Sequence, residues 1–273
     1  MTDKVPMNTK KRHPLIAAIL SLLVPGLGHI YAGNPGKGWL IIGFVAGLLL
    51  IAGLFGFLST FYGFVSFFSI LLVIYIYALV SAVRLAFKNR DYTLKSYNRW
   101  YWYLAIFVAV TLILQIMASS RGKLLGYEIF RIGSKPMGPV LQVGDFITAN
   151  TRFRDVEVGD VVIFIYPRDR SLSFVKRVAA VGGDTLSISE GIVYRNGKHE
   201  TLLDVPADLR TREASISMEE IVIPESEVFV LGDWRDNSND SRFWGTVPVS
   251  DITSKATYIF YSSDRGRIGK AVE

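Results

Sequence analysis

The sequence contains no cysteine and only three histidines among its 273 residues. Without cysteine, disulfides, thiolate nucleophiles and cysteine-ligated zinc or iron–sulfur sites are excluded. The histidines, His13, His29 and His199, show none of the paired spacings of a metal site and offer no serine–histidine–aspartate arrangement. We therefore expect neither a metal ion nor another cofactor.

Acidic residues are scarce before residue 120, where ten Lys/Arg face two carboxylates and give a charge of +8. The rest of the chain carries twenty basic and twenty-two acidic residues, or −2, so the two parts sum to the stated +6. The positive charge thus belongs to short loops beside apolar segments, as in membrane proteins that keep Lys and Arg on the cytoplasmic side. This distribution argues against nucleic-acid binding and indicates the lipid bilayer as a partner.

A basic tail at residues 1–13 precedes a membrane module over residues 14–118. The apolar segments of this module are residues 14–32, 38–58, 62–83 and 101–118. The last three are predicted to span the membrane because each is long and almost free of charge. The first is interrupted by Pro25, Gly26 and Gly28, which favours a re-entrant segment, and a fourth ordinary span is the alternative.

The basic residues also predict the topology. If the first apolar segment is re-entrant, the tail, Lys37 and the basic loop at residues 84–100 all lie in the cytoplasm. With four ordinary spans, the tail and the basic loop would lie on opposite sides. Both arrangements place residues 119–273 on the extracytoplasmic side of the membrane. The protein is thus predicted to be a multi-pass protein of a bacterial-type cell (inner) membrane.

Residues 119–273 predict a mostly-β extracytoplasmic domain behind an α-helical membrane anchor. The clearest short apolar runs are residues 146–147, 161–166, 174–181, 192–194 and 228–231. Asn196-Gly197 predicts the turn of a hairpin. Residues 199–226 are polar and predict an excursion from the sheet, with a short helix near residues 207–220.

Three stretches of this domain carry a resemblance to a known family. They read FRIGSKPMGPVLQVGDFI, SFVKRVAAVGGDTLSI and VFVLGDWRDNSNDSRFWGTVP. In this order they resemble the nucleophile segment, the Lys-Arg box and the Gly-Asp box of signal peptidase I. The resemblance implies a serine/lysine dyad on a largely β fold, which cleaves the signal peptides of exported proteins at the outer face of the membrane.

The resemblance also implies roles for individual residues. Lys176 would be the general base, and Ser238 would donate to or accept from its amine and orient it. Asp233 would lie near the site as a structural residue, and Asp240 and Arg242 would form a structural ion pair. In the family the rim of the active site dips into the bilayer. The side chains of Met137, Val140 and Leu141 are expected to be exposed and keep the apolar character of that rim, but the sequence does not show whether they enter the bilayer.

Strand alternation supports the lysine assignment. It places Phe174, Lys176 and Val178 on one face, where neighbouring apolar groups would desolvate the amine and lower its pKa. A neutral lysine is what a serine nucleophile needs as its base. Arg177 points the other way and is expected to be a surface or structural charge.

The nucleophile segment departs from the family pattern at its central residue. Pro136 stands where the family has its nucleophilic serine, and proline has neither a hydroxyl nor the backbone N–H that would line the oxyanion hole. Ser134 falls on the family's other serine, an oxyanion donor, roughly 6.5–7 Å away along an extended strand. A Ser134–Lys176 dyad would require the segment to shift.

Further departures are Val140 for threonine, Ala180 for glycine, Gly182 for proline and Trp234 for asparagine. Three functions therefore remain open. The first is an endopeptidase that acts through Lys176 and Ser134. The second is a catalytically inactive pseudopeptidase that binds extended peptides or a membrane partner. The third is a transport or scaffold protein whose function lies in the membrane module.

Overall fold

The computed structural model describes residues 9–89 and 92–272 and divides into two compact units. The first comprises Met1–Leu58 and Tyr62–Leu125, and the second comprises Ser59–Phe61 and Gly126–Glu273. The boundary thus lies after residue 125 rather than after residue 118. The physical reason is Leu125, which is buried against Gly53 and ties the short helix α6 (Arg121–Leu125) to the first unit.

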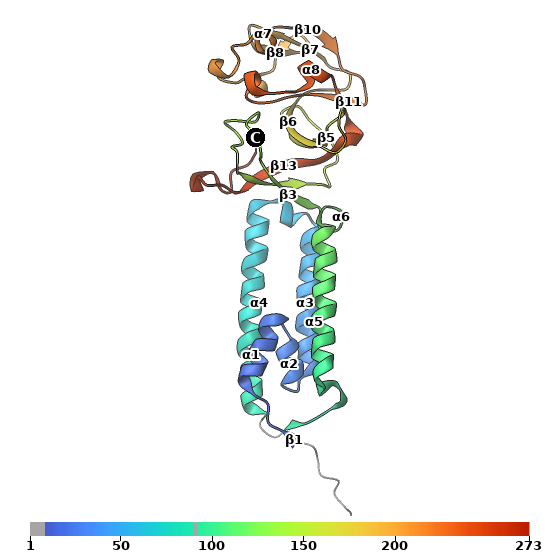
Figure 1. Cartoon of the computed structure of the whole chain (residues 1–273), viewed down its shortest axis with the longest axis vertical. Helices are drawn as coiled ribbons and strands as arrows, with labels where there is room; N and C mark the ends of the chain where they lie inside the picture. Colours follow the sequence, from blue (N-terminus) through green and yellow to red (C-terminus); the bar gives the residue numbers. More distant parts are fainter. Residues whose placement is uncertain (1–8, 90–91, 273) are drawn as a thin grey trace, which may run out of the picture. The chain divides into compact units, whose positions relative to one another are not determined.

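Three long apolar helices form the frame of the first unit (Figure 1). They are α3 (Pro35–Leu54), α4 (Phe61–Lys88) and α5 (Trp100–Ser119), and each is long and apolar enough to cross a membrane. The Asn34 side chain accepts a hydrogen bond from the Lys37 backbone N–H (3.0 Å) and so caps the start of α3. Helix α4 extends past the predicted apolar segment because its last residues, through Lys88, are still good helix formers.

The first apolar segment forms two short helices instead of one long helix. They are α1 (Pro14–Leu23) and α2 (Leu27–Tyr31), and the chain turns between them at Val24–Gly26. Ten residues of helix span roughly 15 Å, about half of the hydrocarbon core of a bilayer. The structure therefore offers no continuous helix for a fourth ordinary span over residues 14–32, and the re-entrant arrangement stays a prediction.

The two short helices pack against the last turns of α4 and the first turns of α5. One buried cluster joins Ala17 and Tyr31 to Ala82 and Ala86. A Cβ on Gly28 would collide with the Ser21 hydroxyl and the Ala17 carbonyl oxygen. Only glycine thus allows α1 and α2 to approach so closely.

We expect Gly28→Val to destabilise the first unit by about 1–3 kcal/mol, because the new side chain overpacks the contact between α1 and α2. Thermal unfolding of the full chain in mild detergent measures the effect. Gly43→Ala on α3 is the matched control, since a Cβ at Gly43 meets nothing within 4 Å. Equal melting temperatures for the two variants would contradict the prediction.

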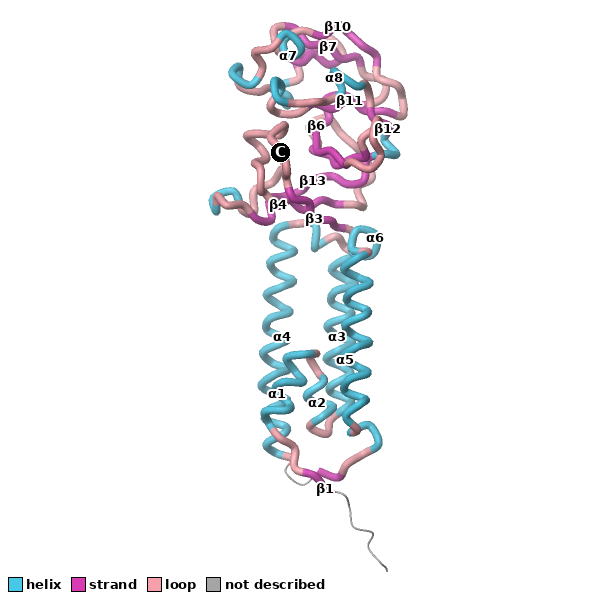
Figure 2. The backbone as a smooth tube through the Cα atoms, in the orientation of Figure 1, coloured by secondary structure: helices cyan, strands magenta, loops and turns pink. Residues whose placement is uncertain are grey.

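The second unit consists of two antiparallel sheets (Figure 2). The larger has the strand order β12-β11-β6-β5-β13-β4-β3, and the smaller has the order β10-β7-β8-β9. The strands are β3 (Tyr127–Arg131), β4 (Phe146–Asn150), β5 (Val161–Ile165), β6 (Ser173–Val181), β7 (Thr185–Ser189), β8 (Ile192–Arg195), β9 (Lys198–His199), β10 (Met218–Val222), β11 (Glu227–Leu231), β12 (Val247–Pro248) and β13 (Ile252–Tyr261). The predicted α-helical anchor with a mostly-β domain is therefore confirmed.

Two local predictions in the smaller sheet had different outcomes. The hairpin turn is confirmed, since Asn196 and Gly197 both have positive φ (53° and 71°) between β8 and β9. Residues 199–226 are only partly an excursion from the sheet. The predicted helix is reduced to α7 (Glu213–Ile216), and β10 pairs with β7, because apolar Met218 and Ile221 pack on the core of the smaller sheet.

Candidate active site

The nucleophile segment forms a loop between β3 and β4 that is closed by backbone hydrogen bonds. The Ile132 N–H donates to the Asp145 carbonyl, and the Gly144 N–H donates to the Ile132 carbonyl (both 2.8 Å). The prediction that the side chains of Met137 and Leu141 are exposed is wrong. Both are buried in the hydrophobic core of the larger sheet, and Val140 is half-buried against it, because the closed loop turns these side chains inward.

Pro136 lies half-buried within this loop, and its backbone is fixed from the opposite segment. The Trp234 N–H donates to the Pro136 carbonyl oxygen (2.9 Å). The Gly232 backbone lies so close to that oxygen and to Ser238 that a Cβ at this position would clash with both. The loop is thus tied to the Gly-Asp box next to the nucleophile position, which opposes the shift that a Ser134–Lys176 dyad would need.

Lys176 lies on β6 with a side chain that is almost completely removed from solvent, at 3% exposure. Its Nζ lies 5.5 Å from the centre of the Phe174 ring, as alternation along the strand predicted. Burial lowers the pKa of the Lys176 amine from 10.5 to about 8, against the opposing effect of Asp240 and Asp233. A large fraction of the amine is therefore neutral in mildly alkaline solution.

Two buried ion pairs neutralise the carboxylates that act on Lys176. Arg177 donates to both oxygens of Asp233, from Nε (2.8 Å) and Nη2 (2.9 Å). Arg242 donates to Asp240 from Nε (2.8 Å) and Nη2 (3.0 Å). Each carboxylate is thus held by its own guanidinium, which leaves desolvation as the dominant effect on the lysine. Arg177 is accordingly a buried structural charge rather than a surface one.

The predicted contact between Ser238 and Lys176 is absent. Ser238 is buried, but its Oγ has no hydrogen-bond partner in the described part of the chain. The physical reason is the position of the Ser238 side chain, which packs against the backbone at Gly232. Ser238 therefore supplies an unused hydroxyl beside the site instead of an orienting hydrogen bond.

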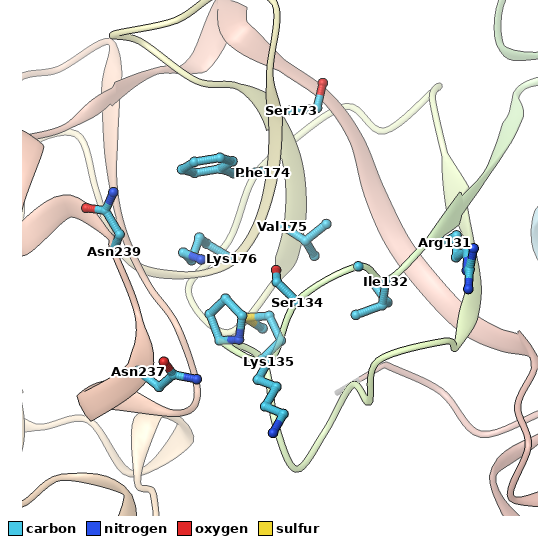
Figure 3. Close-up of a pocket in the computed structure, with 13 residues that line it drawn as sticks. Arg131, Ile132, Ser134, Lys135, Ser173, Phe174, Val175, Lys176, Asn237 and Asn239 are labelled. Carbon is cyan, nitrogen blue, oxygen red and sulfur yellow. The ribbon is translucent and has the colours of Figure 1, made fainter.

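Residues of the nucleophile segment and of the Lys-Arg box line one cleft of about 420 Å³. Figure 3 shows Ser134 and Lys176 on its walls, Asn237 and Asn239 on the segment opposite, and the Lys135 side chain directed away. Ser134 is exposed, and no hydrogen bond joins it to Lys176 among the residues described. The structure thus brings Ser134, Pro136 and Lys176 to one cleft without forming a dyad.

Two residues that the sequence did not single out fix the Gly-Asp box. Buried Arg235 donates to the carbonyls of Gly232 and Leu203 (2.8 Å for the latter). Asp236 accepts from the Thr211 N–H (2.7 Å) and the Arg212 N–H, which helps to hold its pKa below the usual value despite partial burial. The resemblance could have indicated both residues, because the Gly-Asp box of the family has arginine and aspartate directly after the position that Trp234 occupies here.

Removal of the buried lysine charge is expected to stabilise the protein at low pH. The amine has a pKa of about 8 when folded and 10.5 as a free group, so the unfolded chain binds the proton more tightly. Stability is therefore lowest below pH ~8 and rises toward pH ~10.5. Lys176→Met should raise the free energy of unfolding by about 3 kcal/mol at pH ~6, with the gain vanishing toward pH ~10.5.

Urea unfolding of the full chain in mild detergent at several pH values measures this difference. Lys135→Met is the matched control, because Lys135 is exposed on the same cleft. A Lys176→Met variant that is less stable than the wild type below pH ~8 would show that the amine is not desolvated in this way.

The described residues contain no group of three or more His, Asp or Glu side chains that is able to hold a metal ion. The cleft holds a buried lysine amine with a lowered pKa, and Pro136 occupies the predicted nucleophile position.

Comparison with known proteins identifies the family. The family of signal peptidases, peptidase S26, matches residues 99–261. A probable signal peptidase I-1 of Synechocystis is 34% identical over 152 residues, which cover 50% of this chain and 74% of that protein. The signal peptidase I of Aquifex aeolicus is 31% identical over 195 residues, which cover 50% of this chain and 76% of its own.

A crystal structure of signal peptidase I from Enterococcus faecalis is similar with 28% identity, and it covers 38% of this chain and 98% of its own. Its TM-score of 0.31 is too low to bear on the fold. The matching residues of the family contain both of the loops that form the cleft as well as the lysine-bearing strand. The chain therefore belongs to the signal peptidase I family.

Proposed function

We propose that this protein binds the signal peptides of exported proteins, in extended form, at the outer face of a bacterial-type cell membrane, and does not hydrolyse them. The single observation that carries this proposal is Pro136 at the predicted nucleophile position, in the same cleft as Lys176. A prolyl residue offers no hydroxyl to attack a peptide bond and no N–H to stabilise the oxyanion. The substrate class follows from membership in the signal peptidase I family.

The edge of β6 supports the binding of an extended peptide. Strand β11 pairs with Arg177–Val181, whereas Ser173–Lys176 pair with β5 alone among the strands described. The free edge of these residues borders the cleft. An extended segment can add to such an edge through main-chain hydrogen bonds and insert alternate side chains into the cleft.

The location of the site is part of the proposal. The three apolar helices are taken as spans, with the basic loop after α4 in the cytoplasm and the second unit outside. A reporter enzyme that is active only outside the cytoplasm should then be active when it is fused after Glu273. The same reporter should be inactive when it is inserted in the loop after α4. The reverse pattern would overturn this topology.

A second candidate function rests on Ser134. Its hydroxyl lines the same cleft as Lys176, whose pKa is lowered to about 8. An endopeptidase with Ser134 as nucleophile and neutral Lys176 as base would then be possible if the loop moved. The hydrogen bond from Trp234 to Pro136 opposes this motion.

One experiment separates the two functions. The full chain in mild detergent is mixed with a fluorescently labelled signal-peptide-bearing precursor, and anisotropy reports binding while mass spectrometry reports cleavage. We expect saturable binding and an intact precursor. If the wild-type chain cleaves the precursor and both Ser134→Ala and Lys176→Ala lose this cleavage, the second function is established. The absence of any binding would contradict the first function.

A further inference from the structure

The first unit contains a groove that has no part in the proposed peptide-binding site. It has a volume of about 610 Å³ and lies among the end of the basic tail, α1, α2 and the start of α5. Figure 2 shows these segments at the same end of the first unit. One end of the groove is basic, with Lys10, Lys11, Arg12 and His13 among its lining residues.

Arg12 is the unusual residue of this groove. Its side chain is 4% exposed, yet Nε and Nη2 have no hydrogen-bond partner in the described residues. The guanidinium is held between two aromatic rings, 4.8 Å from the centre of Tyr31 and 4.7 Å from that of Tyr92. A buried guanidinium with unpaired donors is costly, so its environment indicates a missing anionic partner.

The local fold fixes this arginine in place. Strand β1 (Thr9–Lys10) pairs with β2 (Tyr92–Thr93), which brings the tail beside Tyr92. The His13 N–H donates to the Tyr31 hydroxyl (3.0 Å), which holds the chain on the other side of the guanidinium. Arg12 is therefore positioned by its neighbours before any ligand binds.

The surrounding charge favours an anion. The side chains of Lys10, Lys11 and His13 are exposed beside Arg12. Residues 1–125 contain only two carboxylates, Asp3 and Asp91, and both lie outside the described residues. No described carboxylate of the first unit thus competes for the guanidinium.

The body of the groove is apolar. Its walls include Ile16 and Leu23 of α1 and Leu104 of α5, which are 44%, 48% and 50% exposed, together with Phe107. A free phosphate ion would satisfy Arg12 but leave these side chains uncovered. A ligand with a phosphate at one end and hydrocarbon at the other covers both parts of the groove.

We propose that this groove binds an anionic phospholipid, with the headgroup phosphate on the Arg12 guanidinium and an acyl chain between α1 and α5. Arginine forms paired N–H···O bonds with phosphate oxygens, and basic pockets between membrane helices are suited to such headgroups. The site lies in the membrane module and is independent of the peptide-binding cleft. It gives that module a binding function of its own.

Native mass spectrometry of the full chain in mild detergent tests the proposal, with phosphatidylglycerol or phosphatidylcholine added at equal amounts. We expect one phosphatidylglycerol to be retained and phosphatidylcholine to bind at least about tenfold more weakly. Arg12→Gln should weaken phosphatidylglycerol binding by about tenfold, because it removes the charge-assisted hydrogen bonds. Arg84→Gln, at an exposed position of α4 outside the groove, is the matched control and should bind as the wild type does.

A second variant keeps the charge and fills the groove. Ile16→Trp should weaken phosphatidylglycerol binding while Arg12 is intact, and it decides the question if Arg12→Gln fails to fold. Equal retention of the two lipids would overturn the proposal, as would unchanged binding in folded Arg12→Gln or in Ile16→Trp. Displacement of the lipid by millimolar inorganic phosphate would show that the site takes the free ion instead.

Discussion

Pro136→Ser is expected to convert the protein into a lysine-dependent endopeptidase, with signal-peptide cleavage at least about 1,000-fold above the wild-type level. The substitution restores two groups at once, a hydroxyl nucleophile and a backbone N–H for the oxyanion. The predicted base is in place, because Lys176 is buried in the same cleft. The Pro136 carbonyl that accepts a hydrogen bond from the Trp234 N–H is unchanged by the substitution.

The pH dependence of the new activity follows from the lysine. Only the neutral amine accepts the proton of the hydroxyl, so cleavage should rise with pH and level off above about pH 8. Product formation from a labelled precursor, measured across this range, gives the profile. A profile that falls as pH rises through 8 would exclude Lys176 as the base.

Pro136→Ala is the matched control for this gain of function. It restores the N–H but supplies no hydroxyl, so it should remain inactive. Adding Lys176→Ala to Pro136→Ser should abolish the cleavage. If folded Pro136→Ser binds the precursor and leaves it intact, the proline is not what disables the site, and the departures at other positions become the explanation.

The second large effect is expected from the buried ion pair at the Gly-Asp box. Asp233→Asn should lower the free energy of unfolding of the second unit by about 3–5 kcal/mol. Both side chains of this pair are almost fully buried, at 4% exposure for Asp233 and 7% for Arg177. Loss of the carboxylate leaves the guanidinium charge desolvated and without its partner.

Urea unfolding of the full chain in mild detergent measures this loss. Glu200→Gln is the matched control, since its ion pair with Arg195 has a similar length of 2.9 Å but is more exposed. That variant should cost less than about 1 kcal/mol. Equal losses for the two variants would show that burial of the Asp233 pair does not set its contribution.

Asp233→Asn has a second consequence at the lysine. The Asp233 carboxylate raises the pKa of Lys176, against the larger effect of burial. Its removal should therefore move that pKa below about 8. NMR of the reductively methylated protein measures the titration of the Lys176 amine, and Lys176→Arg identifies its signal. This titration reports the electrostatic effect separately from the loss of stability.

Much of the architecture could be predicted from the sequence because it depends on local patterns. Long apolar runs predicted three of the helices, and alternation along residues 174–181 placed Phe174 and Lys176 on one face. The first apolar segment also showed its break at Pro25 and Gly26, where the chain turns between α1 and α2. Such features follow from neighbouring residues alone.

Other features required contacts between segments that are distant in the chain. The sequence suggested an apolar rim at Met137 and Leu141, but closure of the loop between β3 and β4 buries both side chains. It assigned Arg177 to a surface or structural role without a partner, and the fold pairs it with Asp233. The lack of hydrogen-bond partners for Nε and Nη2 of Arg12 among the described residues can also be recognised only after the tail and the helices have packed.

The sequence by itself determined that a proline occupies the nucleophile position, because the absence of a hydroxyl and of an N–H is a covalent property of Pro136. Only the tertiary structure decided that Lys176, the predicted base, is buried with a lowered pKa. The pKa of Lys176 is lowered by burial of its side chain in the fold. It is raised by the carboxylates of Asp233 and Asp240, which are themselves paired with arginines. These groups come from different strands and loops, so their combined field exists only in the folded chain.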